Sequence, residues 1–399
     1  MTQLIRNAKL VLPDSVTDGW IELSDGKIAE LGTGKEPGRA FDSILDAEGG
    51  YVVPGFVDIH VHGGASSDFR DGTKEAYLNV LRAHLKGGTT TIVPTLSTSS
   101  YETMMKSIRV FEEIRDNWNT YEDIPELAGM HLEGPYVSKD QLGAQDKELA
   151  RLPDKEEYTK LLRETDAIKR WSVACELPGA YELASVLRKR NINVSIGHSD
   201  ATCTQALDAF QNGFTCVTHL YSSCSIVHRI GPFRVAGLVE AAFLSDDADV
   251  EMIGDGIHLP PELLKLIVKI KGPDKIALIT DCIRPGAKEA VPEGTIDYDD
   301  LEKKHPIILE SGVAILPDRK SFAGSIATTS HIVKTAVTKA GVPLHDAVKM
   351  ASLTPARILG LDKEIGSLEK GKKANLLILD QELSVRKILI NGKNVGGNR

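Results

Sequence analysis

The sequence predicts an α/β protein in which a (β/α)8 barrel, the TIM barrel, is joined to a small β-sandwich domain built from both chain ends. Residues 1–53 and 361–399 are strand-like and punctuated by turns. Over residues 54–360, apolar strand-like runs alternate with amphipathic segments of helical spacing. Eight such alternations match the eight units of a TIM barrel. A doubly wound open sheet is the alternative for this alternation of elements.

The two chain ends are predicted to form one small domain together. Asp25-Gly26 stands between alternating apolar residues, a strong β-hairpin signal, and Asn391-Gly392 marks a second tight turn. Each end is too short to enclose a hydrophobic core alone, so we expect their strands to pair with each other. The alternative is that each end covers the central domain separately. The predicted domain boundaries fall at 53/54 and 360/361.

The central part supplies eight candidate strands, and most of them end in a polar or ionisable residue. The runs are FVDIHVH (56–62), TTTIVPTL (89–96), AGMHLEG (128–134), WSVACEL (171–177), NVSIGHS (193–199), CVTHLY (216–221), VEMIGDG (250–256) and KIALITD (275–281). The spacing of apolar residues predicts helices between and after them. The clearest helical segments are 73–86, 100–116, 328–340 and 345–352.

Composition restricts the class of function. The 399 residues are 42% hydrophobic and 26% charged, as in folded globular proteins. Lys and Arg total 47 against 56 Asp and Glu, and the net charge of −9 argues against binding to nucleic acid or to an anionic membrane. An anionic substrate therefore needs a local basic site. The five cysteines form no CxxC pair and no long apolar run occurs, so we expect a cytoplasmic protein with reduced thiols.

Ionisable residues gather at the ends of the apolar runs, and in a TIM barrel these ends converge on the active-site face. His60 and His62 are two positions apart, so both side chains leave their strand on the same face. An HxH pair alone is often structural, but apolar strands rarely end in several ionisable groups by chance. We interpret the set as a site for one or two divalent ions. Nitrogen and oxygen ligands of this kind suit zinc, iron, manganese or cobalt, and zinc or iron is the first expectation. The candidate ligands are His60, His62, Glu133, His198 and His219.

Other chemistries lack their motifs in this sequence. There is no GxSxG nucleophile elbow, since GHS places Ser199 after a histidine, and there is no GxGxxG or GxxxxGK[ST] loop. Metal-assisted hydrolysis needs a base near the attacking water, and Asp281 at the end of the eighth run is a candidate. His131 is expected either to support the metal ligands from behind or to be a hydrogen-bonded core histidine.

The order of motifs resembles a known family. PGFVDIHVHG, followed by HLEGP, GHS, THLY, DGIH, TD and AGS, is similar to the amidohydrolase superfamily, and within it to the N-acetylglucosamine-6-phosphate deacetylases. Many relatives bridge two metals with a carboxylated lysine on the fourth strand, but WSVACEL has none and Glu133 takes its place, as in these deacetylases. The resemblance covers essentially the whole chain. It implies a homodimeric enzyme that converts N-acetylglucosamine-6-phosphate to glucosamine-6-phosphate and acetate.

The resemblance also implies roles for individual residues. Glu133, His198 and His219 match the principal metal site, while His60 and His62 match a second one. Asp281 matches the catalytic aspartate. The residues that match substrate contacts are His258 near the acetyl carbonyl, Gln145 in GAQD, and Arg229 in HRIGPFR, which would reach the sugar phosphate across a dimer interface.

One segment departs from the family pattern. After THLY the family usually continues with Asn-Ala-Met, where this chain has Ser222-Ser223-Cys224. The hydroxyl and backbone N–H groups of Ser222 and Ser223 can still bind an anion. Arg284 is either a second anion contact or a solvated loop arginine. The alternatives to the lead function are a deacetylase of an isomeric or unphosphorylated N-acyl amino sugar, and a catalytically silent paralogue.

Overall fold

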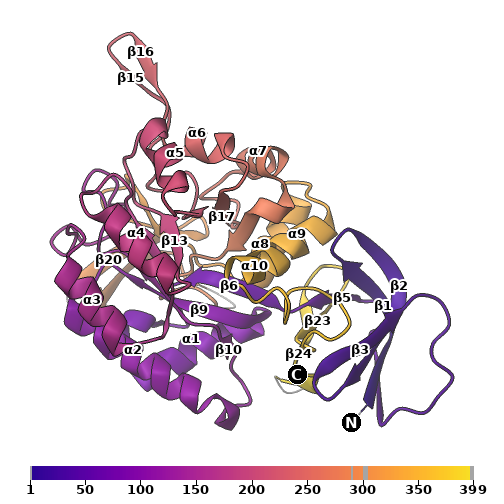
Figure 1. Ribbon diagram of the computed structural model, residues 1–399. Coiled ribbons are helices and arrows are strands. Elements are labelled where there is room, and N and C mark those ends of the chain that lie inside the picture. Colours follow the sequence, from indigo (N-terminus) through magenta and orange to yellow (C-terminus); the bar gives the residue numbers. More distant parts are fainter. Residues whose placement is uncertain (1, 289–290, 300–303, 396–399) are drawn as a thin grey trace.

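The computed structural model describes residues 2–288, 291–299 and 304–395. A barrel of parallel strands surrounded by helices lies beside a β-rich part to which both ends of the chain contribute (Figure 1). The predicted TIM barrel with a small β domain is confirmed, and the doubly wound alternative is wrong because the strands follow one another in chain order around the barrel.

Within the described ranges, eight parallel strands form the barrel, and each lies in one of the predicted runs or overlaps it. Hydrogen bonds from Asp281 N to His60 O at 3.0 Å and from Thr280 Oγ1 to Asp58 Oδ2 at 2.5 Å join the last strand to the first. Almost all strand residues are buried, which explains runs that are continuously apolar rather than alternating. The barrel strands are β6 (Phe56–Val61), β9 (Thr89–Ser97), β11 (Met130–Glu133), β12 (Ile168–Val173), β13 (Asn193–Ile196), β14 (Cys216–Val217), β17 (Asp249–Ile253) and β18 (Ile276–Ile279).

Helices cover the outside of the barrel (Figure 1). Side-chain caps define where they begin: Thr73 accepts a hydrogen bond from Ala76 N, and Ser100 accepts one from Thr103 N. The four helices predicted from periodicity are confirmed, and no helix in the described ranges is long and apolar enough to span a membrane. The helices are α1 (Lys74–Lys86), α2 (Tyr101–Asp116), α3 (Lys155–Glu164), α4 (Ala180–Lys189), α5 (Cys203–Gln211), α6 (Leu238–Leu244), α7 (Pro261–Lys271), α8 (Thr329–Thr338), α9 (Leu344–Ala351) and α10 (Leu353–Ile358), with 3-10 turns η1 (Phe69–Asp71), η2 (Trp118–Thr120) and η3 (Pro273–Lys275).

The two chain ends share one sheet, as predicted, and do not cover the barrel separately. In the described part of the chain this sheet has eight strands, and the antiparallel pair β5–β23 joins the N-terminal strands to the C-terminal ones. The turn between β2 and β3, at the N-terminal edge of this sheet, also contacts the C-terminal segment, because Ala374 N donates to Gly26 O at 2.8 Å. The boundaries at 53/54 and 360/361 stay predictions. The strands are β1 (Thr2–Leu12), β2 (Ser15–Ser24), β3 (Lys27–Gly32), β4 (Ser43–Asp46), β5 (Tyr51–Pro54), β23 (Leu376–Leu379), β24 (Val385–Ile390) and β25 (Lys393–Asn394).

Short strands inserted between barrel units were not expected from the sequence. A hairpin projects from the barrel at the top of Figure 1, and a four-stranded antiparallel sheet follows the eighth barrel strand. The hairpin strands are β15 (His228–Ile230) and β16 (Phe233–Val235). The strands of the four-stranded sheet are β19 (Gly294–Asp299), β20 (Lys304–Glu310), β21 (Val313–Ile315) and β22 (Phe322–Gly324), and the remaining short strands are β7 (Gly63–Gly64), β8 (Ser67–Asp68) and β10 (Glu126–Leu127).

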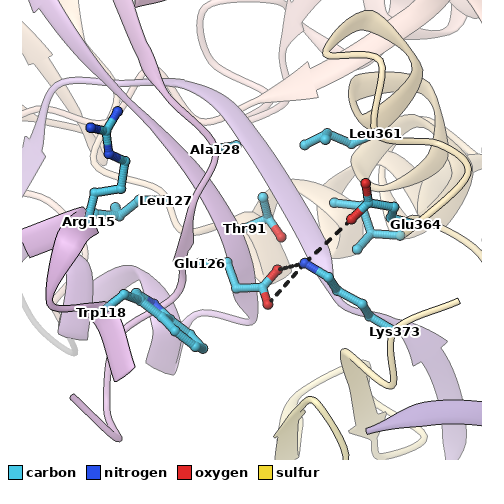
Figure 2. Close-up of a pocket in the computed structure, with 10 residues that line it drawn as sticks. Thr91, Arg115, Trp118, Glu126, Leu127, Ala128, Leu361, Glu364 and Lys373 are labelled. Carbon is cyan, nitrogen blue, oxygen red and sulfur yellow. Dashed lines mark hydrogen bonds and ion pairs between the residues drawn. The ribbon is translucent and has the colours of Figure 1, made fainter. Parts of the chain in front are cut away.

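A cavity of about 330 Å³ lies where the base of the barrel meets the C-terminal segment. Figure 2 shows Lys373 between the carboxylates of Glu126 and Glu364, with nitrogen–oxygen distances of 3.2 and 3.7 Å. Glu126 also accepts from the side-chain amides of Asn375 and Asn391 at 3.2 and 3.1 Å. These bonds hold the C-terminal segment against the barrel, at the end of the strands opposite to the ionisable cluster.

Candidate metal centre and active site

The candidate site lies at the carboxyl ends of the barrel strands, as the sequence predicts. His60 belongs to β6 and Glu133 ends β11. His198, His219 and Asp281 each stand two positions after the end of a strand, β13, β14 and β18 respectively. No side chain of the set is more than 11% exposed. The residues brought together are His60, His62, Glu133, His198, His219 and Asp281.

Three of these residues have left-handed backbone conformations. The φ angles of His198, His219 and Asp281 are 49°, 27° and 46°. Such conformations cost of order 1–3 kcal/mol each for a non-glycine residue and persist where the surrounding structure enforces them. Hydrogen bonds hold two of them: Asp281 N donates to His60 O at 3.0 Å, and His219 N donates to the Glu251 carboxylate at 3.2 Å. The backbone turn after each strand therefore aims the side chain at the centre of the barrel mouth.

The histidine side chains converge on the carboxylate of Glu133. Nε2 of His219 and of His198 lie 2.7 and 3.1 Å from its Oε1. Nε2 of His60 lies 3.4 Å from the same oxygen, and Nε2 of His62 lies 3.3 Å from Oε2. Two overlapping groups result, and within each the potential ligand atoms lie within 4.8 Å of one another. The groups are His60, His62 and Glu133, and Glu133, His198 and His219.

This donor set fits divalent metal ions. Imidazole nitrogens and a carboxylate are the ligands that zinc and iron take in catalytic sites, and Glu133 belongs to both groups as a bridging ligand would. The outer nitrogen of one ring is held by the backbone: Nδ1 of His198 donates to Gln141 O at 2.9 Å, which leaves Nε2 for an ion. The five predicted ligand residues therefore lie together in two groups that could hold an ion.

The cluster is strongly polarised. Burial alone would raise the pKa of Glu133, but the charges of His60 and His198 and the histidine hydrogen bonds hold it well below its usual value. Burial lowers the pKa of His62, but hydrogen bonds to Asp281 and Glu133 outweigh it and raise the pKa to about 10. The negative charges of Glu133 and Asp281 thus favour the protonated form of the histidine rings. A divalent cation bound between these side chains would neutralise the same negative charges.

Asp281 lies at the edge of the cluster. Its Oδ1 is 3.2 Å from Nε2 of His62 and 3.6 Å from Nε2 of His60. Burial raises the pKa of Asp281, but the hydrogen bond from His62 and the charges of both rings dominate and lower it. The ionised carboxylate is therefore next to the candidate ion sites and is also part of the cavity wall.

Two buried charged residues behind the cluster were missed by the sequence analysis. Glu251 in β17 and Arg170 in β12 form an ion pair with side chains that are 0% exposed. Burial would raise the pKa of Glu251, but Arg170 and His60 outweigh it and lower the pKa to about 2. An acidic residue inside the apolar run VEMIGDG was the available signal.

His131 matches the second of its two alternatives, the hydrogen-bonded core histidine. Its Nε2 lies 2.7 Å from Ser172 Oγ and its Nδ1 lies 3.3 Å from Thr95 Oγ1, so it is a hydrogen-bonded core histidine. Its ring also meets the ring of His60 edge-on, with centroids 4.7 Å apart. Burial and the nearby charge of Arg170 hold the pKa of His131 well below its usual value. The neutral ring therefore supports His60 from behind.

A cavity of about 390 Å³ opens above the cluster, and its volume suits a small-molecule ligand. His258 lines the cavity, and its Nδ1 donates to Asp255 at 2.7 Å, which leaves Nε2 for a ligand. Gln145 also lines it, but its amide is bonded within the cluster: Nε2 donates to Glu133 Oε2 at 2.7 Å, and Oε1 accepts from Thr98 N at 2.6 Å. Gln145 thus stands between the candidate ligands and the cavity.

The candidate residues for an anionic group are divided between the cavity and the surface. Ser222 and Ser223 line the cavity. Arg284 lines it too, but its guanidinium forms two bonds to Asp71, so it is neither free nor a simply solvated arginine. Arg229 is exposed in the projecting hairpin and is not part of the cavity of its own chain.

The four-stranded sheet adds a wall that the sequence analysis missed. Phe322 and Lys320 line the cavity, and the ring of Phe322 packs on His258 with centroids 4.5 Å apart. The sequence contains no spacing signal for this wall, because short antiparallel strands inserted after the eighth run lack a periodic pattern of their own.

The chain resembles known proteins over its whole length. The amidohydrolase family model matches residues 51–395. The chain is 32% identical over 401 residues to an N-acetylglucosamine-6-phosphate deacetylase of Lysinibacillus sphaericus, covering 98% of this chain and 97% of that one. It is 29% identical over 395 residues to an N-acetylgalactosamine-6-phosphate deacetylase of Escherichia coli O157:H7, covering 98% and 99%. The crystal structure of N-acetylglucosamine-6-phosphate deacetylase from Pasteurella multocida superimposes with a TM-score of 0.88 at 26% identity, covering all of both chains.

The chain therefore belongs to the amidohydrolase family, whose members are metal-dependent hydrolases. Within that family it groups with the N-acetylglucosamine-6-phosphate deacetylases, so the resemblance inferred from HLEGP, GHS and DGIH is confirmed.

Proposed function

We propose that this amidohydrolase removes the acetyl group from N-acetylglucosamine-6-phosphate and releases glucosamine-6-phosphate and acetate. The observation that carries the proposal is the convergence of four histidines on Glu133, with Asp281 beside them, at the floor of a cavity of about 390 Å³. The volume suits a phosphorylated monosaccharide, and the names of the relatives support this substrate class.

The chemistry assigns a task to each group. A bound divalent ion supplies Lewis acidity, which lowers the pKa of a water ligand toward about 7 and polarises the acetyl carbonyl. Asp281 takes the proton from the attacking water and returns it to the leaving amine. When protonated on both nitrogens, His258 keeps its bond to Asp255 through Nδ1 and donates from Nε2 to the carbonyl oxygen as negative charge develops there. Gln145 keeps Glu133 in place at the wall of the cavity.

We assign Glu133, His198 and His219 to the principal ion, and His60 and His62 with Glu133 to a second one. Zinc or iron is our proposal for the ion, because both accept imidazole and carboxylate ligands. Elemental analysis of the purified protein tests this assignment. One or two equivalents of a divalent ion are expected, and a protein that binds none after incubation with either metal would contradict it.

The substrate is tested by acetate release from a panel of sugars. We expect N-acetylglucosamine-6-phosphate to give the highest kcat/KM, followed by the galactosamine isomer and then by unphosphorylated N-acetylglucosamine. The galactosamine isomer is the second candidate, because a relative with that name is nearly as similar and Ser222-Ser223-Cys224 alters the expected anion loop. A panel in which every compound is inactive with a metal-loaded protein would favour the silent paralogue.

We further propose that the enzyme acts as a homodimer through the projecting hairpin. Ile230 and Phe233 face each other across β15 and β16 and are 63% and 74% exposed, while Arg229 and Arg234 form the next cross-strand pair. An isolated two-stranded hairpin is marginally stable in water, and like charges directly opposite each other destabilise it further. A second copy would cover the apolar pair and bring Arg229 to the phosphate in its cavity.

Sedimentation analysis tests the dimer. A dimer is expected for the unmodified chain, and the double substitution of Ile230 and Phe233 by serine should shift it to monomer without unfolding the barrel. A chain that stays monomeric at micromolar concentration would contradict the proposal. We also place the enzyme in the cytoplasm, a location supported by its five unpaired cysteines.

A further inference from the structure

A buried pair of opposite charges crosses the barrel interior beneath the candidate metal centre. Glu251 projects inward from β17 and meets Arg170 from β12, and both side chains are 0% exposed. Arg170 also donates to Ile59 O and to Ser195 Oγ, each at 2.9 Å. The guanidinium is thus fixed by groups from three strands, β6, β13 and β17, and Glu251 is fixed by the guanidinium.

The other oxygen of Glu251 faces the cluster. Oε2 lies 2.9 Å from Nδ1 of His60 and 3.2 Å from the backbone N of His219. A carboxylate can only accept these bonds, so Nδ1 of His60 carries the hydrogen. In the neutral ring that binds a metal, the lone pair of His60 is then on Nε2, which lies 3.4 Å from Glu133 Oε1 and 3.2 Å from Nε2 of His62. One oxygen therefore contacts a member of each ligand group.

We propose that Glu251, held by Arg170, is a positioning residue that sets the ring orientation and the tautomer of His60 and links the two metal subsites. The inference rests on the metal centre of the proposed function and adds a residue that supports it. Glu251 is not among the residues that line the cavity and belongs to neither ligand group. It acts through the side chain of His60 in one group and through the left-handed backbone of His219 in the other.

A contribution to folding stability alone does not explain why Arg170 and Glu251 form a buried ion pair. Taking two charges out of water costs about as much as their attraction returns, so well-packed apolar residues of similar volume usually serve a barrel interior equally well. Removing one partner is different, because it leaves an unpaired buried charge. A test must therefore separate the loss of the pair from the loss of the contact with His60.

Two variants and one control distinguish the loss of the ion pair from the loss of the contact with His60. Glu251→Gln breaks the pair. The double variant Arg170→Met with Glu251→Met removes both charges at similar volume. Asp249→Asn is the control: Asp249 is two residues away on β17, and its carboxylate pairs with Arg357 at 2.6 Å instead of with a residue of the cluster. The readouts are metal content after dialysis against graded chelator, the absorption spectrum of the cobalt-substituted protein, and the thermal unfolding midpoint.

We expect both Glu251 variants to bind metal about 10- to 100-fold more weakly, as is usual when a carboxylate behind a metal-bound histidine is removed. The second ion should be lost first, because His60 belongs to that subsite. The double variant should regain thermal stability but not metal affinity, and Asp249→Asn should keep wild-type affinity. A double variant with both stability and metal affinity restored would show a merely structural pair and would overturn the proposal.

A measurement on the unaltered chain keeps the proposal testable if a variant does not fold. In the zinc-loaded protein with ¹⁵N-labelled histidine, NMR should show His60 with hydrogen on Nδ1, its signals assigned by their loss in His60→Asn. Hydrogen on Nε2 would overturn the proposal. A wild-type protein that binds no divalent ion would instead contradict the proposed function, so the two failures are distinguishable.

Discussion

The floor and the mouth of the same cavity are built in different ways. The floor consists of residues at barrel strand ends, all nearly buried and each bonded to at least one other member of the cluster or to the backbone. The mouth consists of the serine loop (Ser222-Ser223-Cys224), the four-stranded sheet and, in the proposed dimer, the hairpin of a second copy. Among its cations, Lys320 is exposed, and Arg284 is already paired with the carboxylate of Asp71.

This difference separates chemistry from recognition. The barrel fixes where bond breaking can occur, because a strand end cannot move without disturbing its neighbours in the sheet. The loops decide which molecule is held above the floor, and loops accept changes that the barrel does not. The departure at Ser222-Ser223-Cys224 is located in the mouth, whereas every expected residue of the floor is present.

The largest effect is expected at the floor, for Asp281→Asn. The amide has nearly the shape of the carboxylate but cannot accept the proton of the attacking water. Because general acid–base groups contribute about 10²–10⁴-fold, kcat should fall by that factor while bound metal and the unfolding midpoint stay unchanged. Steady-state kinetics with elemental analysis checks this. A fall of less than tenfold would remove Asp281 from the role of base.

The second prediction concerns acid stability and a buried histidine next to the floor, where Gly63 follows His62. His84 in α1 is 0% exposed, and its Nε2 donates to Gly63 O at 3.0 Å. Burial lowers the pKa of His84 to about 4, against about 6.5 in the unfolded chain. The unfolded state therefore binds the additional proton first, and stability falls as pH drops below 6.5.

His84→Gln keeps a donor for Gly63 O but does not titrate. Between pH 7 and pH 5 the wild type should lose about 2 kcal/mol more of its unfolding free energy than this variant. Urea unfolding at both pH values measures the difference. Equal losses in the two proteins would show that His84 does not contribute to acid sensitivity.

The difference between the floor and the mouth also explains which parts of the site could be predicted from the sequence. The eight runs and the ionisable residues at their ends were recognisable because buried parallel strands are continuously apolar, so a histidine or carboxylate at the end is conspicuous. Glu251 and Arg170 were missed because their partnership joins two distant strands, β17 and β12, and no local spacing indicates it. The wall with Phe322 and the projection of the hairpin depend on tertiary packing, and short antiparallel inserts carry no distinctive period.

The third prediction tests recognition at the mouth. If a second copy brings Arg229 to the phosphate, Arg229→Ala should raise KM for the 6-phosphorylated sugar by roughly tenfold or more, because charge-assisted bonds to phosphate contribute about 1.5–3 kcal/mol. The unphosphorylated sugar should be nearly unaffected.

Arg234 provides a matched control, because it lies directly across the hairpin from Arg229 and is also exposed. Arg234→Ala should change KM less than twofold by comparison. The same increase in both variants would indicate a general effect of hairpin charge. A wild-type enzyme without preference for the phosphorylated sugar would make the unphosphorylated substrate the better interpretation.

The smallest effect is expected at the four-stranded sheet, where two cations follow one another before β22. Arg319 pairs with Glu310 at 2.8 Å, whereas the ammonium of Lys320 makes no hydrogen bond or ion pair with any described residue and its side chain lines the cavity. A bound phosphate therefore gains from the charge of Lys320 but not from that of Arg319. Because Lys320 is exposed, Lys320→Gln should raise KM for the phosphorylated sugar only about two- to fivefold, an effect that added salt reduces. Arg319→Gln removes an equal charge one residue away and should leave KM unchanged. An unchanged KM in Lys320→Gln would assign the anion to the hairpin and the serine loop alone, whereas equal increases in both variants would indicate long-range attraction rather than a contact.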